Sequence, residues 1–394
     1  MAGRSNIWKL YGIRFFYSLI PAYVIERLYW EERGMTIQYV VYTEIIYAIA
    51  IMLLELPTGI LADKWGRKPM VVLAACMGCL EFFLLLHASQ FWHFALVVVL
   101  AAAGSSAASG TETALLYDSL AANGRERAFE KIVGRMRGFD LVATMLAALG
   151  GSWLAHQFGF AFNYWLSLFS MGLCLLLTCL LIEPVTSPSA TGQNEEPLPV
   201  KQFVRQALLQ FRDRPGLLLV VLAATVTGAA INFIDEFWQI YLDRIGISVL
   251  YFGLFSAAIY FLQLPGSLLA YRLRDIFGCR PLLLIILAGL TLGFGYMAAV
   301  PGTSSIAALF LICLFAGMIE PLAAGYLHHR IDSSMRATMG SFQSFGTNAA
   351  IMGTGLGFGF ASARWDIFGG YGLIAVLCGG FLTYFFFASK RQLD

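Results

Sequence analysis

The sequence GILADKWGRKP at residues 59–69 separates two long apolar stretches with a short run of charges. The apolar stretches cover residues 37–58 and 70–88, and each is close to the roughly twenty residues that a membrane-spanning helix needs. Charged side chains such as Asp63 and Arg67 are costly inside lipid, so we expect them at the membrane surface. This stretch therefore predicts a tight loop between two membrane-spanning helices.

The composition extends this interpretation to all 394 residues of the chain. Apolar residues make up 59% and charged residues 13%, whereas a soluble protein carries about 25% charged residues. Lipid must therefore solvate much of the surface. The expected fold class is an all-α membrane protein with twelve transmembrane helices in two six-helix pseudo-symmetric bundles. The predicted spans are 9–29, 37–58, 70–88, 93–117, 135–156, 161–182, 216–240, 249–271, 282–300, 305–327, 338–361 and 368–388.

The basic residues predict the orientation of these helices. Positive charge is enriched in cytoplasmic loops of membrane proteins. Most of the 26 Lys and Arg residues fall on one side if both termini are cytoplasmic, and Arg14 lies within the membrane. The opposite side then holds only Arg27, Arg33, Arg244 and Arg364. We expect a multi-pass protein of a bacterial cytoplasmic membrane. The formal net charge of +2 argues against nucleic acid as a partner.

A change of composition divides the chain into halves. Residues 183–214 hold a Pro- and Ser-rich linker and then an amphipathic stretch, which predicts a cytoplasmic linker with an interfacial helix. The bundles are then residues 1–182 and 215–394. The halves also resemble each other, since Leu56-Pro57 and Leu264-Pro265 lie 208 positions apart. After a four-residue insertion, Gly66 matches Gly278. Repeats of this kind are typical of transporters.

The 59–69 loop resembles the signature loop of the major facilitator superfamily, G-x-L-A-D-[RK]-x-G-R-[RK]. The string SGTETALLYDSL resembles that of bacterial efflux-type members. The resemblance implies a cytoplasmic latch, with Arg67 paired to an acid at the end of span four, for which Asp118 is suitably placed; a solvated loop acid is the alternative. The sequence also departs from the family's exporters. These carry a G-P-x-x-G-G pattern in span five, and here Gly150-Gly151 keeps only its final glycines. The residues of this latch are Gly59, Asp63, Gly66, Arg67, Lys68 and Asp118.

Three charges lie at similar depth in predicted spans: Arg14 on span one, Glu112 on span four and Glu320 on span ten. Such charges need a partner or a water-filled cavity. We expect an Arg14–Glu112 ion pair, with Glu112 or Glu320 binding protons or a cationic substrate group. A purely structural pair between spans one and four is the alternative. Glu81, in the middle of span three, faces inward or is protonated. The substrate- and proton-binding residues are then Arg14, Glu112, Glu320, Tyr17, Asn232 and Gln263.

These features predict a secondary active transporter for a small organic molecule, most simply a proton-coupled exporter. An importer of a nutrient or metal chelate, working as a symporter or facilitator, is the alternative. No nucleotide-binding G-x-x-x-x-G-K-[ST] sequence and no H-E-x-x-H sequence occur, so we expect no enzyme activity, no cofactor and no bound metal. The expected partners are the substrate, protons and the lipid bilayer, and the expected state is a monomer.

Overall fold

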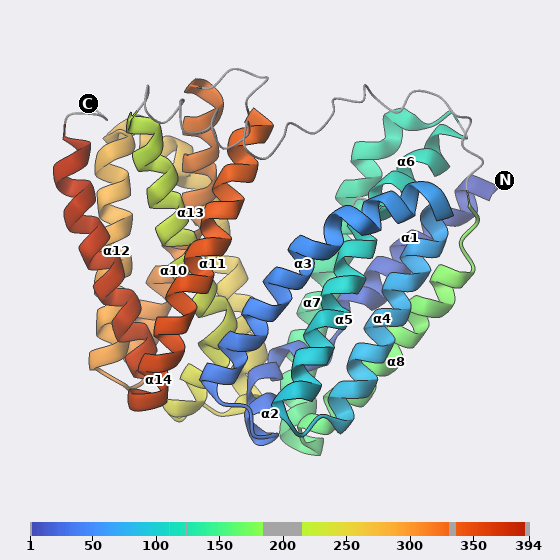
Figure 1. Cartoon of the computed structure of the whole chain (residues 1–394), viewed down its shortest axis with the longest axis horizontal. Coiled ribbons are helices and arrows are strands. Elements are labelled where there is room, and N and C mark those ends of the chain that lie inside the picture. Colours follow the sequence, from blue (N-terminus) through green and yellow to red (C-terminus); the bar gives the residue numbers. More distant parts are fainter. Residues whose placement is uncertain (1, 110, 123, 184–214, 331–335, 391–394) are drawn as a thin grey trace. The chain divides into compact units, whose positions relative to one another are not determined.

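The computed structural model describes residues 2–109, 111–122, 124–183, 215–330 and 336–390. All regular secondary structure in these ranges is helical (Figure 1). The predicted linker helix lies outside the described residues. The predicted domain limits, 1–182, 183–214 and 215–394, stay a prediction.

The first compact unit contains the described residues up to Glu183 together with 248–257. Its N-terminal part begins with a broken helix, continues with a helix of 29 residues and ends with α8; η3 and the start of α11 also belong to it. Its elements are α1 (Ala2–Ser18), η1 (Pro21–Val24), α2 (Glu26–Glu32), α3 (Ile37–Trp65), α4 (Arg67–His87), α5 (Phe91–Ala108), α6 (Thr111–Ala121), η2 (Glu126–Ala128), α7 (Phe129–Phe158) and α8 (Phe160–Cys179).

The second unit contains the described residues 215–247 and 258–390. Its last helix has 54 residues, but Trp365 and Asp366 leave helical geometry, and Asp366 has a φ of 51°. That helix therefore holds two spans. The elements of this half of the chain are α10 (Pro215–Arg244), η3 (Val249–Tyr251), α11 (Phe252–Phe277), α12 (Cys279–Ala299), α13 (Ser305–Arg330) and α14 (Arg336–Ser389).

Twelve spans are consistent with this arrangement. Ten helical segments of the described chain are long and apolar enough to cross a membrane. The first span is not counted among these ten because α1 has only 17 residues, which is too short on its own. The span then continues as η1 and α2. Division of α14 at its kink supplies the last span. Two spans that were predicted as continuous are interrupted. The predicted span 9–29 breaks between α1 and η1, and the predicted span 93–117 is divided into α5, which ends at Ala108, and α6, which starts at Thr111.

The break in span one is stabilised by polar side chains of span six. Pro21 starts η1 and has no backbone N–H, so it cannot donate the hydrogen bond that a continuous helix would need at this position. The Asn163 side chain donates hydrogen bonds to the carbonyl oxygens of Pro21 and Gly151 at 3.0 and 2.8 Å. The Ser167 hydroxyl accepts the Ala22 N–H at 3.0 Å. Both polar side chains are fully buried, so they replace the hydrogen bonds that water cannot supply there.

The two halves repeat the same local structure. Gly66 ends α3 with a φ of +93°, and its predicted counterpart Gly278 precedes α12 with a φ of +84°. The Tyr29 hydroxyl donates to the Leu85 carbonyl at 3.2 Å, and the Tyr241 hydroxyl donates to the Met297 carbonyl at the same distance. In both pairs the residues are 56 positions apart. The internal repeat that the sequence predicts is therefore present in the packing of each unit.

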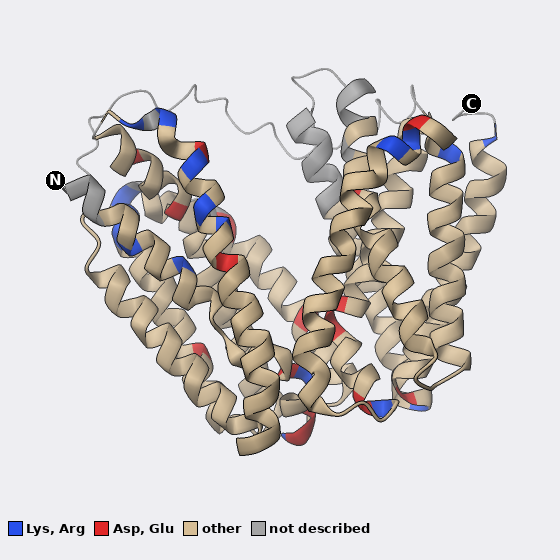
Figure 2. Ribbon diagram, turned by 180° about the vertical axis from the view of Figure 1, so that it is seen from behind, with Lys and Arg blue, Asp and Glu red and all other residues tan. Residues whose placement is uncertain are grey.

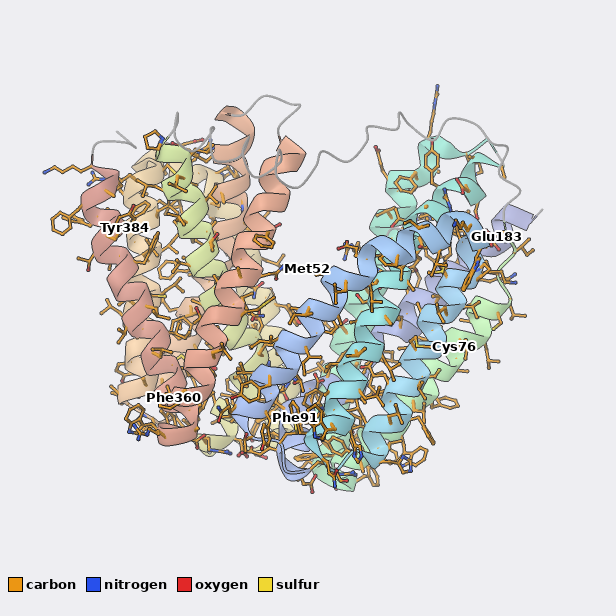
Figure 3. All side chains as sticks on the ribbon, viewed as in Figure 1. Met52, Cys76, Phe91, Glu183, Phe360 and Tyr384 are labelled. Atoms are coloured by element: carbon orange, nitrogen blue, oxygen red, sulfur yellow. The ribbon has the colours of Figure 1, made fainter. Side chains whose placement is uncertain are left out.

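Charged and apolar side chains are segregated along the helices. Lys and Arg gather near the helix ends, and few charges lie between them (Figure 2). Large apolar side chains such as Phe360 and Tyr384 project outward from the helices (Figure 3). Leu53, Phe169 and Phe387 are more than 60% exposed. Such a surface is stable in hydrocarbon and not in water. The chain is therefore a multi-pass membrane protein.

Candidate functional site

Arg14 in the penultimate turn of α1 contacts two carboxylates from other helices. Its Nη1 lies 3.2 Å from Oε2 of Glu112 on α6, and its Nη2 lies 2.9 Å from Oδ2 of Asp140 on α7. Ser18, one turn later on α1, donates a hydrogen bond to the other Asp140 oxygen at 3.0 Å. The expected Arg14–Glu112 pair is thus present, and Asp140 enlarges it to a cluster of three charges. Whether the cluster binds protons or substrate stays a prediction.

The cluster is largely buried and incompletely satisfied. The side chains of Arg14, Glu112 and Asp140 are 24%, 15% and 15% exposed. Arg14 Nε and Glu112 Oε1 are buried without a hydrogen-bond partner in the described part of the chain. Unpaired buried polar atoms cost free energy, so a donor and an acceptor remain there for water or a ligand. Two carboxylates facing one guanidinium also leave one negative charge in excess if all three groups are ionised.

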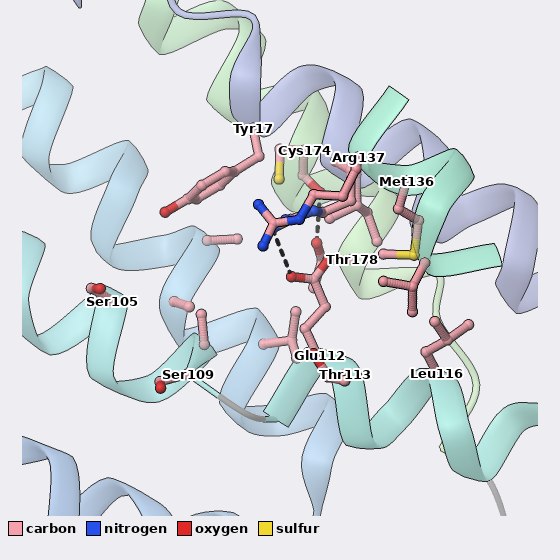
Figure 4. A pocket seen from close by; sticks show the side chains of 17 residues that line it. Tyr17, Ser105, Ser109, Glu112, Thr113, Leu116, Met136, Arg137, Cys174 and Thr178 are labelled. Carbon is pink, nitrogen blue, oxygen red and sulfur yellow. Dashed lines mark hydrogen bonds and ion pairs between the residues drawn. The ribbon is translucent and has the colours of Figure 1, made fainter. Parts of the chain in front are cut away.

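A cavity of about 340 Å³ opens beside this cluster, within the first unit (Figure 4). It is lined by five spans, and Tyr17 lies one turn after Arg14 on the same wall. Its walls mix apolar, hydroxyl and charged side chains, as small-molecule sites do. Its polar lining includes Arg14, Tyr17, Ser105, Ser109, Glu112, Thr113, Arg137 and Thr178.

The 59–69 loop is built around Gly66, whose φ of +93° and ψ of 167° join α3 to α4. That conformation is essentially restricted to glycine. It lets α4 begin at Arg67, whose Nη1 lies 2.5 Å from Oδ2 of Asp118 on α6. The Asp118 side chain is 14% exposed, so it is an ion-pair partner and not a solvated loop acid. A role of this pair in conformational change stays a prediction.

Glu183 also holds this loop, although it lies far away in the sequence. Its carboxylate oxygens accept the backbone N–H groups of Arg67 and Lys68 at 2.8 and 2.7 Å. The first N–H groups of a helix lack partners within it and attract negative charge. Glu183 therefore caps the N-terminus of α4 from the end of span six (Figure 3).

The remaining latch residues are placed as follows. Gly59 lies on α3, and a Cβ added there would meet no described atom within 4 Å. Its role in the latch stays a prediction. Asp63 lies in the last turn of α3, and its side chain is outside the described part. Lys68 contributes its backbone N–H to the Glu183 contact.

Three predicted site residues lie in the second unit. Glu320 is exposed on α13, and Asn232 and Gln263 are partly exposed on α10 and α11. The backbone carbonyl of Gln263 lies where a side chain on Gly317 would have to be, so α11 and α13 are in close contact. These three residues belong to the second unit and the Arg14 cluster to the first, so their predicted role in a shared site stays a prediction. Among the described residues, no group of three or more His, Cys, Asp and Glu could hold a metal ion.

The sequence model described as Major Facilitator Superfamily matches residues 10–354. The chain belongs to the Major Facilitator Superfamily. In this superfamily member, the matched region includes the 59–69 loop and every residue of the Arg14 cluster.

Curated relatives of this superfamily member are transporters. An uncharacterized transporter of Buchnera aphidicola subsp. Acyrthosiphon pisum is 27% identical over 53% of this chain and 55% of its own. The multidrug resistance protein MdtH of Photorhabdus laumondii is 31% identical over 27% of this chain and 25% of its own. The chain thus matches about half of the length of the first relative and less of the other.

Solved structures share the fold at low sequence identity. The nucleoside transporter NupG aligns with a TM-score of 0.76 and 14% identity, over 99% of this chain and 100% of NupG. A D-xylose–proton symporter aligns with a TM-score of 0.68 and 14% identity, over 100% of this chain and 98% of the symporter. These likenesses establish the fold of this superfamily member and not its substrate.

Two residues of the site were missed from the sequence. Asp140 carries a detectable signal, since it is an ionisable residue within a candidate span and such residues are functional by default. Glu183 carries none, because its position at the end of span six does not reveal which helix terminus it reaches. Only the folded packing of span six against α4 shows that contact.

Proposed function

We propose that this chain is a secondary active transporter that exports a small organic molecule in exchange for protons by alternating access. Its place is a bacterial cytoplasmic membrane, where it works as a monomer with both termini cytoplasmic. The partial similarity to the multidrug resistance protein MdtH favours export. In this proposal Glu320, Asn232 and Gln263 contact the substrate from the second bundle, and the 59–69 loop with Asp118 is the cytoplasmic latch.

One observation carries the proposal: Arg14 lies between Glu112 and Asp140 beside a cavity within the membrane spans. An excess negative charge is costly at this depth, so the cluster gains stability from one added positive charge. A proton or a cationic group of the substrate can supply it. The two compete because either one neutralises the same site, and such competition is what exchange requires.

The membrane potential is sufficient to drive this exchange. One proton moving through 100 mV releases about 2.3 kcal/mol. A shift of that size changes a conformational equilibrium by more than tenfold. Protonation of one carboxylate would also weaken its hold on Arg14 and so change the contact between α1 and α6 or α7. The bound cation thereby affects how these helices pack.

Replacement of Glu112 by Gln tests the proposal. The amide keeps the shape of the side chain but cannot exchange a proton, so coupled transport should be lost while the protein stays folded in the membrane. Proton movement in inverted vesicles, measured upon adding each of a panel of candidate compounds, gives the result. Glu130→Gln at the exposed start of α7 is the matched control and should transport normally.

The outcomes separate the alternatives. Wild-type rates in Glu112→Gln would overturn the role of the cluster. Compound-dependent uptake into cells, in place of extrusion, would replace the exporter by an importer of a nutrient or metal chelate. Transport that is unchanged after the proton gradient is dissipated would identify a facilitator.

A further inference from the structure

A second cavity, of about 200 Å³, lies in the first unit at the break in span one. Its walls come from α1, η1, α7 and α8. Among the described residues that line it, only Ser170 has a polar side chain, and its hydroxyl already donates to the Phe16 carbonyl at 2.9 Å. Apolar cavities of comparable size stay free of water and bind molecules such as benzene. Water is therefore not the expected occupant of this cavity.

Two adjacent glycines of α7 account for the space. A Cβ added to Gly151 would lie 2.7 Å from the carbonyl oxygen of Pro21, so α7 closely approaches the break in span one. A Cβ added to Gly150 would meet no described atom within 4 Å. Gly151 thus allows the helices to pack, and Gly150 leaves a gap beside that contact. Protein interiors contain few voids larger than a water molecule, so a gap of this size calls for an occupant.

The cavity opens toward lipid between α7 and α8. Leu146 and Phe169 border it and are 54% and 63% exposed. Both lie near the middle of their membrane-spanning helices, so their exposed apolar side chains face hydrocarbon. Pro21, Ala147 and Ser170 form its inner walls and are buried. The cavity therefore leads from the lipid to the broken end of α1.

The cavity is elongated along the helices. Its lining on α7 runs from Leu146 to Leu154, which is about 12 Å at 1.5 Å per residue. On α8 the lining runs from Leu166 to Leu173, or about 10 Å. An acyl chain of a bilayer lipid extends in the same general direction as membrane-spanning helices. A molecule with polar groups would find no free hydrogen-bonding side chain in the described lining.

We propose that this cavity binds the acyl chain of a bilayer phospholipid, which enters between Leu146 and Phe169 and packs against Leu19 and Pro21. The chain supplies the van der Waals contacts that an empty cavity lacks. It supports the break in span one from the lipid side, as Asn163 does through its hydrogen bond from span six. The described lining of this cavity shares no residue with that of the cavity beside Arg14, so the inference does not depend on the proposed function.

Photo-cross-linking of the full chain in phosphatidylcholine vesicles tests the inference. The probe is a phosphatidylcholine with a diazirine in the middle of one acyl chain, and mass spectrometry locates the label. We expect label on Leu19 or Pro21 of the inner wall as well as on the exposed Phe169. Gly150→Phe fills the gap and should lower inner-wall labelling, relative to Phe169, by at least about tenfold, the effect of excluding about two methylene groups. Gly150→Leu should cause a smaller loss in the same direction.

The matched control is Gly172→Phe. Gly172 lies on α8 outside the cavity lining, and a Cβ added there also has open space. This variant adds the same side chain to the same bundle and should keep wild-type labelling of the inner wall. Gel filtration shows which variants are folded, and the smaller Gly150→Leu change keeps the test available if Gly150→Phe does not fold.

Each outcome decides for or against the lipid site. Loss of inner-wall label in Gly150→Phe with retention in Gly172→Phe supports it. Label on Phe169 without label on the inner wall of the wild-type chain overturns it, because lipid then stays outside the cavity. Equal inner-wall labelling in folded Gly150→Phe also overturns it. Displacement of the inner-wall label by a transported compound would assign the cavity to the substrate and overturn the lipid assignment.

Discussion

Arg14 determines the charge balance of its cluster because both neighbouring carboxylates depend on it. Arg14→Ala leaves Glu112 and Asp140 facing each other inside the membrane spans without a cation. Removing one partner of a buried ion pair costs about 3–5 kcal/mol, and partial exposure favours the lower end. We expect a lower thermal unfolding temperature in detergent. Adding Glu112→Gln and Asp140→Asn should restore much of the loss, because no uncompensated charge remains.

The matched control for this experiment is Arg137→Ala. Arg137 lines the same cavity but is exposed. Its removal should leave the unfolding temperature nearly unchanged, since exposed charges contribute little. Equal losses in both single variants would mean that general charge, and not the Arg14 ion pairs, stabilises the bundle. Failure of the triple variant to recover would contradict the electrostatic explanation.

A contact between two residues can be predicted from the sequence only as far as their positions along the helices decide it. Similar depth in the membrane was sufficient to pair Arg14 with Glu112, because depth follows from the residue count along each helix. The third member, Asp140, was not recognised as a partner. Depth does not give the rotation of a helix about its axis, and that rotation aims Asp140 at Arg14.

The turn between α3 and α4 depends on Gly66. An alanine there must adopt a φ near +93°, which costs about 1–3 kcal/mol. Its Cβ would also lie 3.1 Å from the Glu183 carboxylate. Gly66→Ala should therefore lower the unfolding temperature. Gly134→Ala inside α7 is the control: its Cβ has open space, so the change should stabilise the helix by about 0.5–1 kcal/mol. A stable Gly66→Ala variant would show that the loop can rearrange.

The cap of α4 makes a separate prediction for hydrogen exchange. Glu183→Ala removes the acceptor from the backbone N–H groups of Arg67 and Lys68. Those amides should exchange with solvent about fivefold faster, which corresponds to a cap of about 1 kcal/mol. Glu183→Gln should give an intermediate rate, because an amide oxygen accepts only one of the two bonds. Unchanged exchange in Glu183→Ala would mean that water caps this helix equally well.

At the scale of elements, helix positions follow from apolar stretches, but helix interruptions do not. Span one was predicted as continuous over 9–29, although it contains Pro21, which starts η1. The full break depends on Asn163 and Ser167 from span six, which satisfy the freed backbone groups. A partner about 140 residues away leaves no local pattern in the sequence.

For the whole molecule, composition and the internal repeat were sufficient to predict the class of fold. The scarcity of charge required lipid, and the matched loops required two related halves. The Arg14 cluster belongs to the first unit, and Glu320 belongs to the second. The repeat is present in the core packing, where the buried tyrosines Tyr29 and Tyr241 make equivalent hydrogen bonds, because each half needs the same core.

The repeated tyrosines provide a test of that duplication. Tyr29→Phe and Tyr241→Phe each remove one buried hydroxyl and leave a carbonyl, of Leu85 or Met297, without that bond. Each change should cost about 1 kcal/mol, the usual net value of a hydrogen bond. The Tyr241 hydroxyl also lies 2.6 Å from the Ser305 hydroxyl oxygen and shares its one hydrogen between the two acceptors, so its loss should be the larger. The two residues lie in different units and share no partner, so the double variant should lose the sum of the two within about 0.5 kcal/mol. Denaturant unfolding of the four proteins in detergent measures these values. A double variant that loses much more or less than the sum would mean that the two bundles do not keep separate cores.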